Sequence, residues 1–387
     1  MSAPAHPDTD IDVDIAICGA GPVGMALALL LVKRGVAPAR IALLDARALA
    51  DAVADPRSIA LSYGSEQLLE QAGAWPLPAT PIHQIHVSRR GQFGRTLIDR
   101  ADHRLPALGY VTRYGELAAA LAAACAAAAI APLRPARVAG MVEHGDAVSL
   151  RLEDGRVLRA AIAVQAEGGV FGQQAPRAVQ RDYQQSAVIA RVAASAPLAH
   201  RAFERFTDEG PLALLPQDGA DGLQYALVWC ARPDQAAHLL ALDDGAFLAR
   251  LGDMFGARLG RFTAVSKRAS YPLGLNADAA ATARTVAIGN AAQTLHPVAG
   301  QGLNLGLRDA AVLARLLAVA PTPAQLQAFG AARQRDRKLT IGLTDSMARV
   351  FAGQGALQAL LGLGLGAVDA FAPARSLLAE LMMYGRR

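Results

Sequence analysis

Short apolar runs and helical patterns alternate at the start of the chain. Val13–Cys18 is an apolar run that ends at a glycine, which is typical of a buried parallel strand. Met25–Lys33 has the periodicity of a helix and ends near Gly35. Ile41–Leu44 is a second strand-like run, and it stops at Asp45. This order predicts a βαβ unit with two parallel strands.

Farther along the chain, strand patterns replace helical ones. The sequence predicts helices over Glu66–Ala74 and the alanine-rich stretch Glu116–Ile130, and hairpins around residues 91–94 and 153–155. Between Gln184 and Leu273 lie five strand-like runs, which are Val188–Val192, Ala202–Thr207, Leu212–Leu215, Tyr225–Trp229 and Ala269–Leu273. We interpret them as a mostly antiparallel sheet of a second domain. From Leu303 onward the pattern is mainly helical.

Composition narrows the class of protein. Of the 387 residues, 53% are hydrophobic and 18% are charged, as in a folded protein with two lobes. The net charge of +5 comes from scattered Lys and Arg that are not interleaved with aromatic residues. An anionic cofactor or membrane surface therefore explains the charge better than nucleic acid does. Cys18, Cys125 and Cys230 lie in apolar runs without CxxC spacing, which predicts buried free thiols, a reducing compartment and no metal site.

The two ends of the chain show no export signal and no membrane span. The first fourteen residues are polar and acidic, unlike a secretory signal peptide. The most apolar tract, Ala359–Val368, is too short to cross a bilayer. We therefore expect a cytoplasmic protein.

A glycine-rich loop joins the first strand to the first helix. Gly19, Gly21 and Gly24 have the G-x-G-x-x-G spacing, and Asp45 follows at the end of the next strand. In this context the glycines let the backbone approach a pyrophosphate, and the acid can bind a ribose hydroxyl. NAD and FAD both fit this loop, whereas a tight turn without a ligand is the less favoured interpretation.

A second glycine segment, at Gly289–Ala310, follows the strand-like run Thr285–Ile288 and leads into a helix. Together with Gly19–Gly24, Asp55–Leu61 and Ala166–Gly169, this segment resembles the flavin-dependent aromatic hydroxylases, the class A monooxygenases. More narrowly, it resembles the ubiquinone-biosynthesis hydroxylases, and further matches lie at Arg201–Thr207, Leu227–Cys230 and Thr340–Ser346. The resemblance extends from near Val13 almost to the C-terminus.

The resemblance implies roles for individual residues. Gly19, Gly21 and Gly24 would cradle the FAD pyrophosphate, and Asp45 would hold the adenosine ribose. Arg57 takes the place of the family arginine near the flavin, and Arg113 would be another FAD contact. The residues expected at the ribityl chain and the isoalloxazine ring are Gly289, Asn290, Pro297, Gly300, Gly302, Leu303 and Asn304. A helix that starts near Leu303 would stabilise the negative charge of reduced flavin.

The proton chemistry is the least determined part of the predicted site. His296, beside Pro297 at the expected flavin ring, is the best polar candidate for a catalytic group, although it could equally fix the loop through hydrogen bonds. His83 and His86 lie in a strand pattern and are predicted to be exposed. Tyr225 and Tyr271 are candidates for lining the substrate cavity, but core packing is favoured for both.

The resemblance also predicts how the domains are divided. The expected fold is α/β, with a Rossmann-like FAD-binding domain, an inserted, mostly antiparallel substrate sheet and a helical C-terminal region. The FAD-binding domain would comprise residues 1–80, 101–178 and 276–345. Residues 81–100 would form a hairpin that joins the substrate sheet, residues 179–275 the substrate domain, and residues 346–387 the C-terminal region.

The implied activity is hydroxylation of a polyprenylated methoxyphenol with NADPH or NADH and O₂, through a C4a-hydroperoxyflavin. Two departures from the wider family, Glu167 in place of Asp and Asn290 in place of Asp, leave other interpretations open. One is a different aromatic substrate, and another is a non-catalytic flavoprotein scaffold of a biosynthetic complex. The favoured interpretation of Val350–Met383 is a set of helices that close the cofactor lobe. Because a polyprenyl substrate comes from lipid, the alternative is a surface that contacts the inner membrane or other ubiquinone-biosynthesis proteins.

Overall fold

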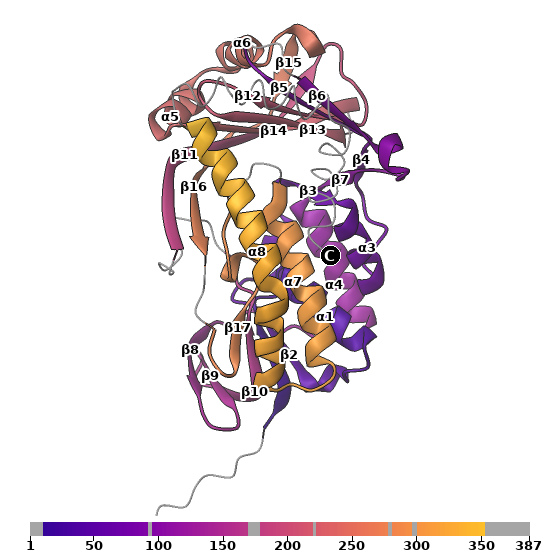
Figure 1. The fold of residues 1–387 in the computed structure, drawn as a ribbon, viewed down its shortest axis with the longest axis vertical. Helices are drawn as coiled ribbons and strands as arrows, with labels where there is room; N and C mark the ends of the chain where they lie inside the picture. Colours follow the sequence, from indigo (N-terminus) through magenta and orange to yellow (C-terminus); the bar gives the residue numbers. More distant parts are fainter. Residues whose placement is uncertain are drawn as a thin grey trace, which may run out of the picture.

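The structure is a computed structural model that describes residues 11–91, 95–168, 179–219, 222–277, 281–295 and 300–352, with backbone only for 343–352. His296, Pro297 and the apolar tract Ala359–Val368 lie outside the described residues. Figure 1 shows two lobes stacked along the long axis of the molecule, which we call the FAD lobe and the sheet lobe. A small three-stranded sheet lies where the two lobes meet.

The FAD lobe is built on a six-stranded sheet with the order β2-β1-β10-β9-β8, in which β17 also pairs with β10. Its central strands are parallel, because β1 pairs in parallel with β2 and β10, and β10 with β17. The predicted βαβ unit is thereby confirmed. The strands are β1 (Val13–Cys18), β2 (Ile41–Leu44), β8 (Val138–Glu143), β9 (Val148–Leu152), β10 (Val157–Gln165) and β17 (Thr285–Ala287).

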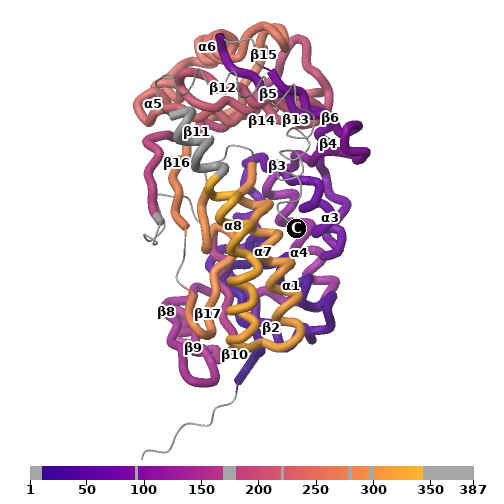
Figure 2. Tube along the Cα trace, in the orientation of Figure 1, coloured from indigo at the N-terminus to yellow at the C-terminus, as the bar shows by residue number. Residues whose placement is uncertain are grey.

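Helices pack against one face of this sheet and bury a large apolar core. In Figure 2 the early helix α1 lies beside α7, which comes much later in the chain. Ile15 and Ile17 of β1 contact the same core as Leu27 of α1, Leu117 of α4 and Leu313 of α7. The helices are α1 (Pro22–Lys33), α2 (Leu49–Val53), α3 (Tyr63–Ala72), α4 (Tyr114–Ala127), α7 (Gln301–Leu317) and α8 (Pro323–Ala352).

The sheet lobe contains eight strands in the order β15-β11-β14-β13-β12-β5-β6, with β16 also paired to β11. All of its pairs are antiparallel except β12 with β5, so the predicted mostly antiparallel sheet is confirmed. The strands are β5 (Gln84–Arg89), β6 (Arg95–Asp99), β11 (Val179–Ala194), β12 (Arg201–Phe206), β13 (Pro211–Gly219), β14 (Gly222–Ala231), β15 (Phe262–Val265) and β16 (Ala269–Ala277).

Two helices, α5 (Pro233–Ala241) and α6 (Asp244–Phe255), cover one face of the eight-stranded sheet, which we call the outer face. Phe203, Trp229 and Phe247 meet in the core between this face and the helices. The opposite face, the inner face, is turned toward the FAD lobe. The three-stranded sheet contacts it there, and comprises β3 (Ser58–Ser62), β7 (Gly109–Arg113) and β4 (Thr80–Ile82).

The structure corrects two details of the prediction. The alanine-rich helix spans Tyr114–Ala127 rather than Glu116–Ile130, because alanine favours a helix without marking its ends. His86 is not exposed: its side chain packs against Phe203 on the outer face and the residue is 4% exposed. The three cysteines are buried and free, as predicted.

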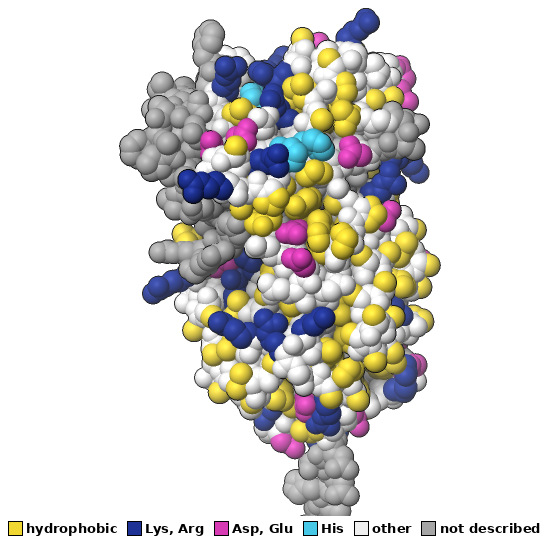
Figure 3. All heavy atoms as spheres, turned by 90° about the vertical axis from the view of Figure 1, so that its right-hand side faces the viewer, with side chains coloured by type: hydrophobic (Ala, Val, Ile, Leu, Met, Phe, Trp, Pro, Cys, Tyr) yellow, Lys and Arg dark blue, Asp and Glu magenta, His cyan; other side chains and the backbone are white. Residues whose placement is uncertain are grey.

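The division into domains stays a prediction. Among the described residues, no helix is long and apolar enough to cross a membrane. The same residues hold no cluster of His, Cys, Asp and Glu side chains suited to a metal ion. On the face shown in Figure 3, basic side chains lie in small separate groups among apolar and acidic ones.

Candidate functional site

The first glycine loop has a shape that only glycine permits at two of its positions. Gly19 adopts φ +108°, and a Cβ there would lie 2.6 Å from the backbone of Ala166 at the end of β10. A Cβ on Gly24 would lie 1.9 Å from the carbonyl oxygen of Gly19. The turn from β1 into α1 therefore passes close to β10 and to the helix itself, with no room for a side chain.

The N-terminus of α1 has no side-chain cap. Gly21 is the N-cap residue and Pro22 is the first residue of the helix. The N–H groups of Val23 and Gly24, in the first turn, consequently have no partner within the helix. A missing Cβ on Gly21 leaves only the Tyr114 hydroxyl nearby, at 3.6 Å. A helix end with free N–H groups beside an open backbone is suited to a pyrophosphate.

Asp45 is positioned by the glycine loop. The residue is 6% exposed, and its Oδ2 accepts a hydrogen bond from the Ala20 N–H at 2.9 Å while Oδ1 accepts one from the Arg47 N–H at 2.8 Å. The Arg134 guanidinium lies 3.9 Å from the same carboxylate and donates to the Ala20 carbonyl oxygen. Each carboxylate oxygen keeps a lone pair for a ribose hydroxyl. The sequence offered no signal for Arg134.

The second glycine segment packs directly on the first. Gly289 (φ +59°) follows β17 in the short 3-10 helix η5 (Gly289–Ala291), and Gly300 (φ +60°) is the N-cap of α7. A Cβ on Gly306 would lie 2.8 Å from Val23 and 3.0 Å from Cα of Gly289. Because these contacts are so close, α7 is held against both η5 and the start of α1.

Helix α7 begins at Gln301, two residues earlier than predicted, and its first turn lies beside η5. A Cβ on Gly302 would be 4.0 Å from Oδ1 of Asn290. Leu303 is partly buried and packs on the core of the FAD lobe. The two predicted sets of residues, around Gly21 and around Gly302, are therefore brought together by the α1–α7 contact.

The Asn304 side chain fixes the start of α7 to strand β3. Its Oδ1 accepts hydrogen bonds from the Ser62 N–H at 2.9 Å and the Ser65 hydroxyl at 2.7 Å. Its Nδ2 donates to the carbonyl oxygens of Ala60 at 3.2 Å and Gly300 at 2.7 Å. Both donors and both acceptor sites of the amide are thus used within the chain. Only the backbone of Asn304 could meet a cofactor without breaking these bonds.

Arg57 lies where the two lobes meet. Its guanidinium makes a bidentate contact with Asp55, at 2.9 Å from Nε and 2.6 Å from Nη2. The same group lies 5.1 Å from the ring centroid of Tyr114 and 5.9 Å from that of Tyr271 on β16. Burial lowers the pKa of Arg57, but the hydrogen bonds and charge of Asp55 outweigh it, so that the pKa is raised. Arg57 therefore stays a cation.

Tyr114 is the most informative residue that the sequence prediction missed. It follows Arg113, the last residue of β7, whose own side chain is exposed. The Tyr114 hydroxyl lies beside Gly21 and its ring beside Arg57, so it spans the two ends of the predicted cofactor site. Its position directly after Arg113, at the start of α4, is a signal that could have found it. Tyr225, by contrast, is a core residue whose hydroxyl bonds to Leu198, as the favoured interpretation had it.

The departure at Glu167 lies next to the first loop. A Cβ on Gly19 would be 2.6 Å from the Glu167 N–H nitrogen, so this segment shapes the turn through its backbone. Burial, and then the charge of Asp45, raise the pKa of the Glu167 carboxyl. The replacement of Asp by Glu therefore places the longer side chain beside the loop, while the backbone of Glu167 still closes the turn at Gly19.

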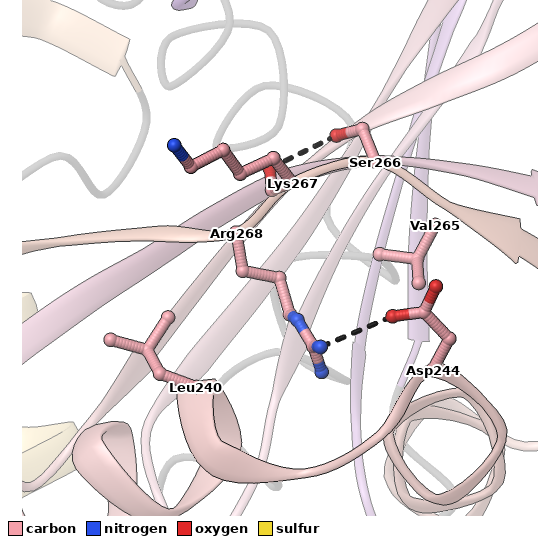
Figure 4. Close-up of a pocket in the computed structure, with 6 residues that line it drawn as sticks. All are labelled: Leu240, Asp244, Val265, Ser266, Lys267 and Arg268. Carbon is pink, nitrogen blue, oxygen red and sulfur yellow. Dashed lines mark hydrogen bonds and ion pairs between the residues drawn. The ribbon is translucent and has the colours of Figure 1, made fainter.

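A separate pocket of about 330 Å³ lies in the sheet lobe and contains none of the predicted residues. Figure 4 shows Arg268 in it pointing to Asp244, 3.1 Å away, with Leu240 and Lys267 at its rim. Arg268 also lies 4.8 Å from the ring centroid of Phe247. Arg268, which directly precedes β16, thus links α6 to α5, where it also donates to the Leu239 carbonyl oxygen at 3.4 Å, and it is not part of the candidate site.

Comparisons with known proteins agree with this geometry. The FAD binding domain family matches residues 12–336. Ubiquinone hydroxylase UbiL of Rhodospirillum rubrum is 34% identical over 388 residues, covering 93% of this chain and 86% of that protein. The 3-demethoxyubiquinol 3-hydroxylase of Escherichia coli is 32% identical over 309 residues, covering 77% of this chain and 78% of that protein. A variant of HpxO from Klebsiella pneumoniae, solved with FAD, has a TM-score of 0.75 at 15% identity, and the match covers 96% of this chain and 99% of that one. This likeness shows a shared fold.

Proposed function

Because the chain belongs to the FAD-dependent monooxygenases of the ubiquinone-biosynthesis type, we propose that it hydroxylates a polyprenylated methoxyphenol with NAD(P)H and O₂. The observation that carries the proposal is the double glycine cradle, in which Gly24 lets the first loop turn tightly into α1 and Gly306 brings α7 against Val23 of α1, beside an open helix N-terminus. FAD supplies the oxygen transfer implied by the resemblance, and the protein binds and orients the two reactants.

In this proposal the described residues each have a task. The first turn of α1 binds the pyrophosphate, Asp45 the adenosine ribose, and Asn290 the ribityl chain. The N-terminus of α7, at Gly300–Leu303, would hold the flavin ring and would favour negative charge on it. Arg57, a retained cation between the lobes, adds positive charge at that end. Pro297 and His296 retain the roles predicted for them.

The relatives and the inner face of the sheet lobe support this substrate. Val228 and Ile189 line that face with partly buried apolar side chains. A prenyl chain gains about 0.8 kcal/mol for each CH₂ buried against such a surface. A substrate of this kind comes from lipid, so we also propose peripheral contact with the membrane and with other enzymes of ubiquinone biosynthesis.

The test is the oxidation of NADPH by the purified FAD-loaded protein in air. We expect the rate to rise when a prenylated 2-methoxyphenol is added, and the flavin to bleach under anaerobic NADPH. Stimulation by other phenols alone would indicate a different aromatic substrate. Flavin that never bleaches with NADPH or NADH would contradict the proposal and favour a scaffold protein.

A further inference from the structure

The inner face of the eight-stranded sheet carries one acidic side chain, Glu204, in an unusual setting. Side chains alternate between the two faces of a strand. Phe203 of β12, Leu214 of β13 and Trp229 of β14 all pack in the outer core under α5 and α6. Glu204, which follows Phe203, therefore points to the inner face, and so do Ala213 and Val228 in the same row of the sheet.

Other residues of the inner face contact the predicted flavin end of the site. Gln217 of β13 accepts a hydrogen bond from the Ser58 hydroxyl at 3.0 Å, and Ser58 is next to Arg57. Tyr271 of β16 contacts Arg57 itself. The face that carries Glu204 is thus the face that meets the cofactor lobe.

The spacing along the sheet leaves room for an aromatic ring. Glu204 pairs with Ala213, which is four residues from Gln217 on β13. At about 3.3 Å per residue, this places Glu204 roughly 13 Å along the sheet from the Ser58 contact. A substrate ring that reacts near Arg57 can therefore point its hydroxyl toward Glu204.

The surroundings of Glu204 are apolar. Its neighbours across the sheet are Val87 on β5 and Ala213 on β13, followed by Val228 and Ile189. The Glu204 side chain is partly exposed, yet within the described part of the chain its carboxylate has no hydrogen-bond or ion-pair partner. A carboxylate without a partner among apolar groups is costly for the fold, so its presence suggests a ligand that satisfies it.

The basic residues nearest to Glu204 form no hydrogen bond or ion pair with it within the described part of the chain. Arg89 of β5 lies on the same face, two residues beyond Val87, which pairs with Glu204. Arg201 and Arg205 of β12 point to the other face, where they bond to Gln84 and to the Met254 carbonyl oxygen. Arg191 shares the inner face but is three strands away, about 14 Å. The Cys230 thiol has its pKa raised by burial and then by Glu204, so it stays neutral.

Resting on the hydroxylase function proposed above, we propose that the Glu204 carboxylate accepts the proton of the substrate's phenolic hydroxyl. The phenolic O–H bond breaks, an O–H bond forms on Glu204, and a phenolate remains, with no change of oxidation state. The phenolate ring is richer in electrons and accepts the new oxygen more readily. After the reaction the proton returns to the product oxygen.

The acidity of Glu204 suits this task. Burial raises the pKa of the Glu204 carboxyl to about 7. A phenol has a pKa near 10, so a carboxyl with a raised pKa is a better matched acceptor than an ordinary one near 4.3. At neutral pH a substantial share of Glu204 is ionised and able to take the proton.

The experiment compares the wild type with Glu204→Gln, Glu204→Asp and the distant surface variant Glu153→Gln, all loaded with FAD. The direct readout is the dissociation constant of 2-methoxyphenol as a function of pH, which reports its hydrogen bond to the Glu204 carboxylate independently of turnover. We expect the affinity to rise as the pH passes through 7 on the wild type and on Glu153→Gln, to rise with a shifted midpoint on Glu204→Asp, and to be independent of pH on Glu204→Gln at unchanged FAD content.

The second readout is product formation. With the prenylated substrate we expect Glu204→Gln to lose roughly 100-fold or more in turnover. Glu204→Asp should keep part of the activity, with its pH profile shifted. The same pH dependence of phenol affinity in Glu204→Gln, or its absence in the wild type, would overturn the role of Glu204. An absence of hydroxylation by the wild type beside a Glu204-dependent change of phenol affinity would instead count against the proposed function alone.

Discussion

The glycine cradle of the FAD lobe and the inner face of the sheet lobe are built on opposite principles. In the cradle, clearances of 1.9–3.0 Å at Gly19, Gly24 and Gly306 let only glycine fit, so backbone shape determines what is bound. On the inner face, small apolar side chains surround the Glu204 carboxyl, which has no partner among the described residues. We therefore propose that cofactor binding depends on the fold, whereas substrate chemistry rests on individual side chains that can change without altering the fold.

The largest expected effect is on the cradle. In Gly24→Ala the new Cβ would overlap the Gly19 carbonyl oxygen, so the loop must open and the helix end moves away from the pyrophosphate. We expect FAD affinity to fall by tenfold or more, which corresponds to at least about 1.4 kcal/mol. The flavin absorbance per protein after purification measures this.

Gly252→Ala in helix α6 is the matched control, because no atom lies within 4 Å of its added Cβ. It should keep full FAD content. A Gly24→Ala protein that retains wild-type FAD would show that the cradle tolerates a side chain, and the contrast between the two regions would fail.

The next effect concerns the contact that holds α7 in place. Asp309 of α7 is fully buried and pairs with Arg333 at 2.7 Å and Arg337 at 2.8 Å, both on α8. Asp309→Ala removes this carboxylate from both guanidinium groups, although Arg333 keeps Asp336 at 2.6 Å and Arg337 keeps the Ala287 carbonyl oxygen at 3.2 Å. Breaking a buried pair in this way typically costs about 3 kcal/mol. We expect a lower Tm and weaker FAD retention, measured by thermal unfolding.

The exposed Asp51→Ala in α2 is the control for Asp309→Ala and should leave the Tm unchanged. An unchanged Tm in Asp309→Ala would mean that the buried ion pairs do not hold α7 against α8.

On the inner face, the comparison predicts a gain of stability on substitution. Burial raises the pKa of Glu204 from 4.5 to about 7, so the folded state binds its proton more tightly than the unfolded chain does. The resulting stability is present below pH 4.5 and is lost as the pH rises through 7. Glu204→Gln has no carboxyl and does not lose stability in this way. The free energy of unfolding of Glu204→Gln minus that of the wild type should therefore increase by about 1–2 kcal/mol from pH 5 to pH 8, as measured by urea unfolding. A constant difference across this pH range would contradict the unpaired state of Glu204.

The smallest effect concerns His86 on the outer face of the same sheet. Neither of its buried ring nitrogens has a hydrogen-bond partner, and burial, with Arg258, Arg201 and Arg95, lowers its pKa from 6.5 to about 4. Its contribution to stability is present above pH 6.5 and is lost as the pH falls toward 4. His86→Leu should therefore gain roughly 1 kcal/mol at pH 5 relative to pH 7, read from the same urea unfolding series. Equal acid sensitivity of the two proteins would disprove this.

The parts of the site that sequence could predict are those with local causes. The spacing of Gly19, Gly21 and Gly24 between a strand and a helix, with Asp45 after the next strand, indicates a dinucleotide loop by itself. The alternation of the strands likewise separates the neighbours Phe203 and Glu204 onto different faces.

The missed residues depend on contacts between distant segments. Arg134 meets Asp45, and Tyr114 meets Arg57, only because the strands pair as they do. The burial of His86 follows from the parallel pairing of β5 with β12 and from the helices that cover their outer face. Alternation shows which residues share a face, but not which face is covered. Glu204 lies in the segment Arg201–Thr207 that carries part of the resemblance, but the sequence alone does not show that its side chain faces the FAD lobe.

The central claim is that the chain binds FAD and inserts one atom of O₂ into a phenol. It is tested most directly by turnover of a prenylated 2-methoxyphenol under heavy-isotope O₂, with NADPH and the FAD-loaded protein, followed by mass spectrometry of the product. The account predicts a hydroxylated product that carries one heavy oxygen atom. Isotope-labelled hydrogen peroxide as the sole product of O₂, or a hydroxylated phenol whose new oxygen comes from water, would contradict the central claim.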